Sequence, residues 1–212
     1  MKIVLVRHGP TEWNAIKRIQ GRIDNPLSEL GVEQVKRRQL PLELRQMTWY
    51  TSPLRRARET AALMGINNPV VESALIEMHW GDWEGEILKP LRKRLGDEMR
   101  QNEARGRDFR PPGGESPEQV QQRIQTWLKQ LALKGEDCAA VSHKGIIRCF
   151  YALARDWDMR GESPVKFDWD GGHVFHFSDS GKLLDRYESI SFSYSPSPSE
   201  GVLKAEIPII KC

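Results

Sequence analysis

Residues 2–14, KIVLVRHGPTEWN, place an arginine and a histidine side by side at the point where an aliphatic run stops. The run KIVLV is short and rich in β-branched residues, a pattern typical of a strand buried on both faces of a parallel sheet. The segment GPTEWN after it supplies residues that form turns and begin helices. The stretch therefore predicts a strand-to-helix junction, with Arg7 and His8 at the end of a buried strand.

The same alternation of strand and helix repeats along the chain. A helix over 28–46 is expected to begin at Ser28, and a strand over 47–52 leads into a helix over 53–65. Ser116 stands where a helix N-cap is expected, before Pro117 and with Gln119 completing a capping box. A buried strand over 137–143 then ends in His143 and precedes a helix over 144–157. Repeated β-then-α units predict an α/β fold with a mostly parallel sheet.

Residues 73–115 interrupt this alternation. They begin with a turn-rich stretch and continue with one charged helical segment over 87–109. The segment RPPGGES then follows, whose prolines and glycines interrupt regular secondary structure. Later segments, 165–170, 172–178 and 183–190, alternate apolar and polar residues and predict antiparallel edge strands. We expect one domain over 1–212, with an excursion at about 73–115 and a C-terminal tail from about 189. The tail begins with SISFSYS, whose alternation of serine with larger residues predicts an edge strand. We expect this tail either to pair with a neighbouring chain or to cover its own sheet edge.

Composition narrows the classes of partner. The chain has 212 residues, is 39% hydrophobic, and carries 32 basic against 29 acidic residues, so its formal net charge is only +3. This near balance gives no general field for nucleic acid, and the apolar runs fall far short of the roughly 18 residues of a membrane helix. Cys138, Cys149 and Cys212 share no metal-binding or redox spacing and follow no signal peptide. We expect a cytoplasmic protein without nucleic-acid or membrane partners.

Basic side chains gather at the predicted strand ends. Arg7, His8 and His143 follow two buried strands, and the segment TSPLRRARETA brings Arg55, Arg56 and Arg58 to the end of a third. In a mostly parallel sheet, ligands bind beyond the carboxyl ends of the strands, where free backbone N–H groups favour anions. An arginine fork can bind phosphate oxygens through two hydrogen bonds. An oxyanion pocket built from these strand ends accounts for the pattern.

These motifs resemble a known family. The segments VRHGPTEWN, GRIDNPLSELG, TSPLRRARETA, EMHWGDWEG and VSHKG, in this order and spacing, resemble the histidine phosphatase superfamily in its phosphoglycerate mutase-like branch. The resemblance covers residues 2 to about 155. It implies a three-layer α/β/α sandwich around a mostly parallel mixed sheet.

The resemblance also implies roles for particular residues. In this family the histidine of the RHG motif attacks phosphorus and forms a phosphohistidine, a role that falls on His8. Attack needs a neutral imidazole whose second ring nitrogen is held by a hydrogen bond. The pattern SxLxRAxxTA selects Arg56 over Arg55 and Arg58. The phosphate-binding residues implied are Arg7, Asn14, Gln20, Gly21, Arg56, His143 and Lys144.

A carboxylic acid is needed for proton transfer to and from the reacting oxygens. In the family this acid precedes a glycine-containing turn, which matches Glu77 in EMHWGDWEG. Asp82 and Glu84 compete for the role on chemistry alone, and we interpret them as hydrogen-bonding residues of the loop. No metal site is expected, so His79, His173 and His176 are interpreted as structural or pocket-lining residues.

Two further features stay open in the sequence. Trp80 and Trp83 either wall the substrate cleft or fill the core, and Trp13 is equally undecided. The basic run KPLRKRLGDEMR is either a solvated helix face, which we favour, or part of a substrate lid.

The departures from the mutase pattern favour hydrolysis. Mutases of the family have a longer excursion with an ERHYG-type sequence, whereas this chain has EMHWGDWEG, and Pro10 replaces their glutamate after RHG. The chain looks most like small phosphatases of the α-ribazole phosphatase type. Lys144 stands where many relatives have glycine, and would add a charge at the phosphate or hold a substrate acid.

The expected activity is therefore metal-independent hydrolysis of a small phosphorylated metabolite. A mutase dependent on 2,3-bisphosphoglycerate is the alternative, and a non-catalytic phosphate-binding module is a third. No cofactor is expected for a phosphatase. A second copy of the chain, forming a homodimer, is a candidate partner.

Overall fold

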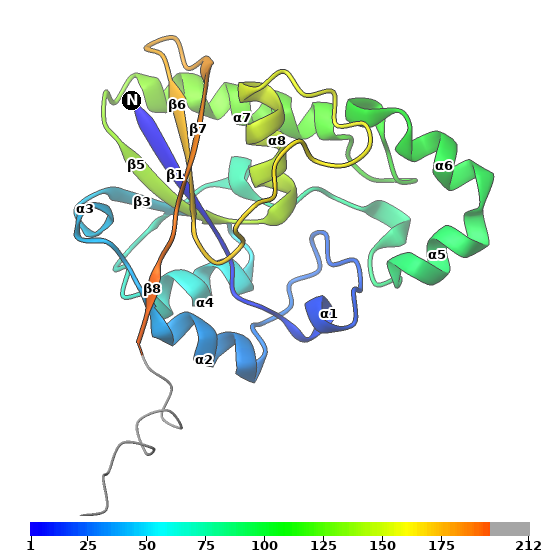
Figure 1. The fold of residues 1–212 in the computed structure, drawn as a ribbon, viewed down its shortest axis with the longest axis horizontal. Helices are drawn as coiled ribbons and strands as arrows, with labels where there is room; N and C mark the ends of the chain where they lie inside the picture. Colours follow the sequence, from blue (N-terminus) through cyan, green and yellow to red (C-terminus); the bar gives the residue numbers. More distant parts are fainter. Residues whose placement is uncertain (196–212) are drawn as a thin grey trace, which may run out of the picture.

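The computed structural model describes residues 1–195 of the chain (Figure 1). A six-stranded sheet has the order β4-β3-β5-β1-β6-β7. Its parallel part consists of β4 (Val70–Val71), β3 (Thr48–Thr51), β5 (Cys138–Ser142) and β1 (Lys2–Arg7). The strands β6 (Gly172–Phe177) and β7 (Leu183–Ile190) add an antiparallel edge. The sheet is mixed and mostly parallel, as the sequence predicts.

Helices cover both faces of this sheet. The helices α7 (Pro117–Ala132) and α8 (Lys144–Ala154) lie on one face, whereas α2 (Glu29–Arg37), α3 (Leu42–Arg45) and α4 (Arg55–Leu63) lie on the other (Figure 1). The strand β1 shows why both faces are apolar. Ile3 and Leu5 pack in the cluster with α7 and α8, whereas Val4 and Val6 pack in the cluster with α4. Successive side chains of a strand point to opposite faces, so an uninterrupted apolar run stabilises a three-layer sandwich.

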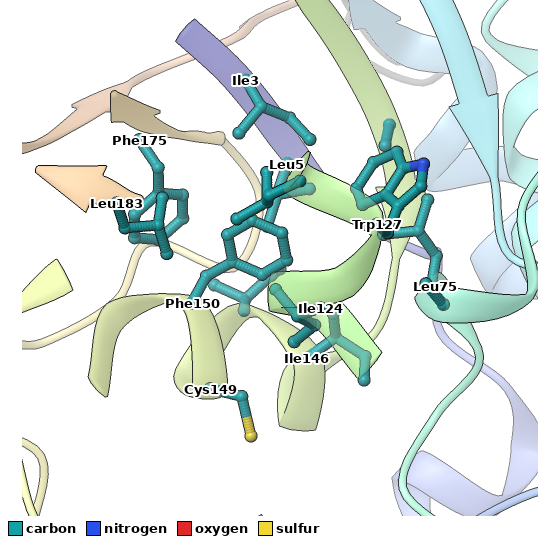
Figure 2. Packing of buried hydrophobic residues seen from close by; sticks show 14 of the residues in the cluster. Ile3, Leu5, Leu75, Ile124, Trp127, Ile146, Cys149, Phe150, Phe175 and Leu183 are labelled. Atoms are coloured by element: carbon teal, nitrogen blue, oxygen red, sulfur yellow. The ribbon is translucent and has the colours of Figure 1, made fainter. Parts of the chain in front are cut away.

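The larger cluster lies between the sheet and α7 and α8. Figure 2 shows Leu5 of β1 and Phe175 of β6 beside Phe150 of α8, with Ile124 and Trp127 of α7 next to them. The rings of Phe150 and Phe175 are 5.4 Å apart between centroids. Burying side chains of this size stabilises a fold by about 1.5–3 kcal/mol each. The cluster fixes the strands from which the site residues emerge.

The capping signal of α7 is present as predicted. The Ser116 hydroxyl accepts the backbone N–H of Gln119, and the Gln119 side chain accepts the backbone N–H of Ser116. Pro117 occupies the first turn, where its missing N–H costs no helical hydrogen bond. The sequence thus determines the start of this helix locally.

Residues between β4 and α7 contribute no strand to the described sheet. They form η1 (Ser73–Leu75), η2 (Gly81–Trp83), α5 (Leu88–Leu95), α6 (Asp97–Glu103) and η3 (Gly106–Asp108). In Figure 1, α5 and α6 lie beside the sandwich, away from the sheet edge that carries β7. A small cluster of Ile19, Trp83, Leu91 and Met99 packs this excursion against the segment after α1 (Glu12–Ala15). The expected single helix over 87–109 is wrong, because Gly96 takes a positive φ of 52° and separates α5 from α6.

Two other expected elements also differ. The helix over 28–46 ends at Arg37, and β2 (Arg38–Gln39) pairs antiparallel with β8 (Ser193–Tyr194) before α3 begins. Residues 165–170 form no strand, because their aromatic side chains pack with His173 and Tyr187 instead. The described start of the tail, up to residue 195, therefore lies along this chain's own β2. The rest of the tail and Cys212 lie outside the described residues.

Candidate active site

Three neighbouring strands end at the same edge of the sheet. Because β3, β5 and β1 are parallel neighbours, the residues that follow them, Ser52, His143 and His8, meet there. Backbone hydrogen bonds between the strands continue past their ends. The N–H of His8 donates to Ser142 O and the N–H of Ser52 donates to Val141 O, both at 3.0 Å. The rings of His8 and His143 are 5.1 Å apart between centroids. The fold thus brings together side chains that are far apart in the sequence.

His8 is buried and has the hydrogen bond expected of a neutral nucleophile. Its Nδ1 lies 2.6 Å from the carbonyl oxygen of Gly9, which can only accept, so Nδ1 carries the proton. Burial lowers the pKa of His8 well below its ordinary value of 6.5, and the charges of Arg56 and Arg7 lower it further. The imidazole is therefore neutral at pH 7, with its lone pair on Nε2.

His143 begins α8 as its N-cap residue and is fully buried. Its Nε2 lies 2.7 Å from the hydroxyl oxygen of Ser52, whereas its Nδ1 has no hydrogen-bond partner among residues 1–195. Burial lowers the pKa of His143 well below 6.5, with Arg56 as the next cause. When the Ser52 hydroxyl donates to Nε2, the ring proton lies on Nδ1, which becomes a neutral donor for an anion.

Arg56 is the arginine of its cluster that the fold buries. Its guanidinium donates to the carbonyl oxygens of Gly21, at 2.8 Å, and Ile23, at 2.9 Å. Burial lowers the pKa of Arg56, while the nearby carboxylate of Glu77 opposes that effect. Arg55 and Arg58 are both exposed, and Arg55 pairs with Glu59. The structure therefore separates the three arginines as the sequence pattern indicates.

Arg7 is half-buried at the end of β1. Its guanidinium lies 5.5 Å from the ring centre of Trp169. Burial lowers the pKa of Arg7, and the negative charge of Glu77 is the strongest effect that raises it. Two cationic groups, Arg7 and Arg56, thus lie close enough to His8 to change its ionisation. Desolvated cations of this kind stabilise an anion more strongly than exposed ones.

The loop after β1 supplies neutral groups. The Asn14 carbonyl oxygen accepts the backbone N–H of Thr11 at 2.9 Å and the Thr11 hydroxyl at 3.1 Å, an arrangement that fixes the side chain and leaves its NH₂ as a donor. Gly21 has a φ of 51°, and a Cβ there would lie 2.0 Å from Oε1 of Glu84. The Gln20 side-chain oxygen is buried and has no partner among the described residues.

Glu77 lies against the first turn of α8. Its Oε2 accepts the N–H of Gly145 at 3.2 Å, and its Oε1 accepts the N–H of Met78 at 2.9 Å. A Cβ at residue 145 would be 2.3 Å from Oε1 of Glu77, so the glycine permits this approach. Glu77 also interacts electrostatically with both Arg7 and Arg56.

The two competing acids differ from Glu77 in their surroundings. Glu84 accepts the backbone N–H groups of Arg22, at 2.8 Å, and Trp80, at 3.0 Å. These bonds connect the two loops that flank the pocket. Asp82 is exposed and its backbone N–H donates to Pro112 O. The interpretation as residues that hydrogen-bond the loop is confirmed for Glu84. It is wrong for the side chain of Asp82, which is exposed and has no hydrogen bond among residues 1–195.

A cavity of about 700 Å³ adjoins Glu77. Lys144, predicted to contact the phosphate or a substrate acid, lines this cavity. Trp80 lines it too, whereas Trp83 is buried in the small cluster of the excursion. The charged residues of α5 are mostly exposed, as a solvated face requires, although Arg92 reaches the cavity.

Several supporting residues have contacts that the sequence does not reveal, although Ser52 and Thr60 belong to the SxLxRAxxTA pattern. The Thr60 hydroxyl accepts the N–H of Gly9 at 2.9 Å and donates to Arg56 O at 2.7 Å, which connects the loop after β1 to α4. The buried Arg38 donates to the backbone oxygen of Arg7 at 3.1 Å and to Asp170 at 3.2 Å. Ser52 was visible as the first residue of the SxLxRA pattern, but its contact with His143 required the sheet order.

The remaining histidines lie in other contacts. His173 is buried beside Tyr187, with 3.0 Å between its Nδ1 and the phenol oxygen. His176 lies 3.5 Å from Glu188, and His79 lies 3.7 Å from Glu84. No group of three His, Cys, Asp or Glu side chains with a metal-binding arrangement occurs among residues 1–195. Within the same residues, no helix is long and apolar enough to cross a membrane.

Comparisons with known proteins show the family of the chain. A model of the histidine phosphatase superfamily (branch 1) matches residues 3–189. The chain is 34% identical over 205 residues to phosphoglycerate mutase-like protein 4 of Arabidopsis thaliana, an alignment that covers 86% of this chain and 89% of that protein. It is 32% identical over 199 residues to the metal-independent phosphoserine phosphatase of the same plant, with 90% and 82% covered. The solved structure of YhfR from Bacillus stearothermophilus matches with a TM-score of 0.72 at 25% identity, over 92% of this chain and 95% of that one.

The chain therefore belongs to the histidine phosphatase superfamily. It is an enzyme, a hydrolase of the histidine phosphatase class. The predicted family and the predicted α/β sandwich are both confirmed.

Proposed function

We propose that the protein hydrolyses the phosphate monoester of a small metabolite without a metal, through a phosphohistidine at His8. The observation that carries the proposal is the state of His8. It is a buried neutral imidazole, with Nδ1–H bound to Gly9 O and with Arg7 and Arg56 nearby. Phosphoryl transfer depends mainly on positioning and on positive groups around the phosphate oxygens, and this arrangement supplies both.

In the first step, Nε2 of His8 donates its lone pair to phosphorus. An N–P bond forms, the P–O bond to the leaving group breaks, and its electron pair stays on the leaving oxygen. The carboxylic acid of Glu77 gives that oxygen its proton, so an alcohol leaves and Glu77 becomes a carboxylate. Arg7, Arg56, Asn14 and the Nδ1–H of His143 stabilise the phosphate oxygens. Gly9 O stabilises the positive imidazole ring that results.

In the second step, water attacks the phosphohistidine. The Glu77 carboxylate takes a proton from the water, the new O–P bond forms and the N–P bond breaks. Its electrons return to Nε2, so His8 is neutral again and Glu77 is again an acid. Inorganic phosphate leaves, and no group outside the chain is consumed except water.

Two comparisons support particular parts of this proposal. The plant relative described as a metal-independent phosphoserine phosphatase supports hydrolysis without a metal. We also propose a cytoplasmic location, because the two described cysteines are free thiols, as is usual in a reducing compartment. The plant relative described as phosphoglycerate mutase-like keeps transfer to an organic acceptor as the alternative.

The experiment is phosphate release in EDTA from p-nitrophenyl phosphate, α-ribazole phosphate, and 3-phosphoglycerate with and without 2,3-bisphosphoglycerate. We compare the wild-type protein with His8→Ala and with His176→Ala, a histidine on β6 outside the site. Release that His8→Ala abolishes and His176→Ala retains supports the proposal. Isomerisation of phosphoglycerate without release identifies a mutase, and tight phosphate binding without turnover identifies a binding module. Either result contradicts hydrolysis.

A further inference from the structure

The cavity beside Glu77 is far larger than a phosphate group requires. It has a volume of about 700 Å³ and lies between α8, the loop that carries Glu77, and the α5, α6 and η3 segments. Cavities of about 300–1,000 Å³ typically enclose a whole small-molecule ligand. Its lining includes Glu77 but neither His8 nor Arg56. Because Glu77 protonates the leaving oxygen in the proposed reaction, the part of the substrate attached to that oxygen lies on the side of this cavity.

Two cations from consecutive turns of α8 line this cavity, Lys144 and Arg148. Residues four apart lie on the same face of a helix, where like charges destabilise it. Neither residue has a carboxylate within ion-pair distance among residues 1–195, in contrast to Arg92, which pairs with Glu103 on the same cavity. Burial lowers the pKa of both, and the charge of Arg148 further lowers the pKa of Lys144.

Aromatic rings hold both cations in place without neutralising them. The Lys144 ammonium lies 5.4 Å from the ring centre of Trp169, and the Arg148 guanidinium lies 5.2 Å from that of Trp157. The Nε of Arg148 is buried and has no hydrogen-bond partner among the described residues. The Arg148 side chain is half-buried and Lys144 is exposed at the mouth of the cavity. Two oriented donors without an internal anion are suited to an external one.

The rest of the lining determines the kind of anion. Three cationic residues, Arg92, Lys144 and Arg148, line the cavity together with the carboxylates of Glu103 and Glu162 and with Glu77, which is a neutral acid when the substrate binds in the proposed reaction, so the net charge of the lining is only +1. That balance disfavours a second phosphate, which carries close to two negative charges, and suits a single carboxylate at the α8 end. Trp80, Leu88 and Phe109 supply an apolar wall for the rest of the leaving group.

We infer that the substrate's leaving group carries a carboxylate that binds between Lys144 and Arg148, with an apolar body along Trp80 and Phe109. This inference rests on the proposed function, because the leaving group is defined by the reaction at His8. It specifies the substrate class as the phosphate monoester of a hydroxy acid larger than glycerate.

The experiment uses a matched pair of substrates, the phosphate ester of phloretic acid and that of its primary amide. The two differ in charge, and their phenol leaving groups are closely similar. We expect the full-length protein to prefer the acid in kcat/KM by about tenfold or more, the usual worth of a charge-assisted hydrogen bond. In Arg148→Met this preference disappears, in Arg148→Lys most of it persists, and in Arg155→Met it is unchanged. Arg155 is the control because it follows the same helix but is exposed and pairs with Asp185.

Equal kcat/KM for acid and amide, or a preference that survives Arg148→Met, overturns the inference while leaving phosphate release, and hence the proposed function, intact. If neither ester nor p-nitrophenyl phosphate is hydrolysed, the proposed function fails instead. Tryptophan fluorescence then tests the cavity directly, because Trp80 lines it and Trp157 and Trp169 contact its cations. Tighter binding of the acid ester, lost in Arg148→Met, supports the carboxylate site, and equal binding overturns it.

Discussion

The hydroxyl oxygen of Ser52 lies 2.7 Å from Nε2 of His143, at the ends of the adjacent strands β3 and β5. The contact couples the Ser52 hydroxyl to the tautomer of a buried, neutral imidazole, because the proton lies on Nδ1 when the hydroxyl donates to Nε2. It connects Ser52, to which the sequence assigns no role, with His143, a predicted phosphate-binding residue. The site is therefore arranged in part by contacts that only the sheet order creates.

Replacing Ser52 with alanine removes the hydroxyl beside Nε2, so the tautomer of His143 loses the hydrogen bond that would hold its proton on Nδ1. We expect kcat to fall by about tenfold, which is the usual effect of losing one hydrogen bond to a residue that stabilises the transition state, with a smaller change in KM. The measurement combines steady-state kinetics with ¹⁵N NMR of the histidine side chains. An unchanged Nε2 chemical shift of His143, together with full activity, would refute this role for Ser52.

Gly145 is expected to be indispensable because its missing Cβ lets Glu77 approach α8. In Gly145→Ala the new methyl carbon would lie 2.3 Å from Oε1 of Glu77, so the carboxyl must move. Alanine is favoured over glycine inside a helix by about 1 kcal/mol, so we expect the variant to fold and to have an equal or higher melting temperature. We expect kcat nonetheless to approach that of Glu77→Gln. Wild-type kcat in Gly145→Ala would show that the exact place of Glu77 is unimportant.

The ionisation of His8 provides a prediction about pH. Since burial, Arg56 and Arg7 lower its pKa well below 6.5, His8 remains neutral when the pH falls through 6.5, and its Nε2 lone pair stays available. NMR titration of the free protein should show that the ring stays neutral when the pH falls below the ordinary midpoint of 6.5. Arg7→Met removes one of the lowering charges and should move the titration upward. A wild-type midpoint near 6.5 would contradict the burial of His8.

Buried neutral histidines also predict how stability depends on pH. Burial lowers the pKa of His173 to about 4, so between pH 6.5 and about 4 the unfolded chain binds a proton there that the folded chain does not. The free energy of unfolding therefore falls as the pH falls through this window, by at most about 1.4 kcal/mol per pH unit for each such site. Urea unfolding at several pH values should show a shallower slope for His173→Gln. An identical slope would mean that His173 is accessible to protons in the folded state.

Much of the fold and of the candidate site is predictable from local patterns. The runs KIVLV and DCAAVSH are apolar on both faces, and the capping box at Ser116 is complete within four residues, so these elements follow from neighbouring sequence. The arrangement of His8, His143 and Arg56 follows from the rule that parallel strands end at one edge. These predictions depend on interactions between residues close in sequence, or on the repeated strand-to-helix unit of a parallel sheet.

The features that could not be predicted depend on contacts between distant segments. The sequence over 28–46 has helical spacing, and Pro41 within it is a local signal for the break before α3. That Arg38 and Gln39 form a strand, however, depends on their pairing with Ser193 and Tyr194 of β8. The aromatic segment 165–170 alternates like a strand, yet Phe167 and Trp169 stack on each other at 4.9 Å and pack beside His173. The cavity beside Glu77 was likewise unpredictable, because its wall joins α8 to helices of the excursion.

The central claim is that His8 Nε2 becomes covalently bonded to phosphorus. It is tested most directly by rapid quenching of the enzyme with a ³²P-labelled substrate, followed by mapping of the acid-labile, alkali-stable label to a peptide by mass spectrometry. We predict label on the peptide that contains His8, absent from His8→Ala and unchanged in His176→Ala. Label on another residue would contradict the account. Turnover with no labelled protein at any quench time would also contradict it, provided that the label on a known phosphohistidine standard survives the same treatment.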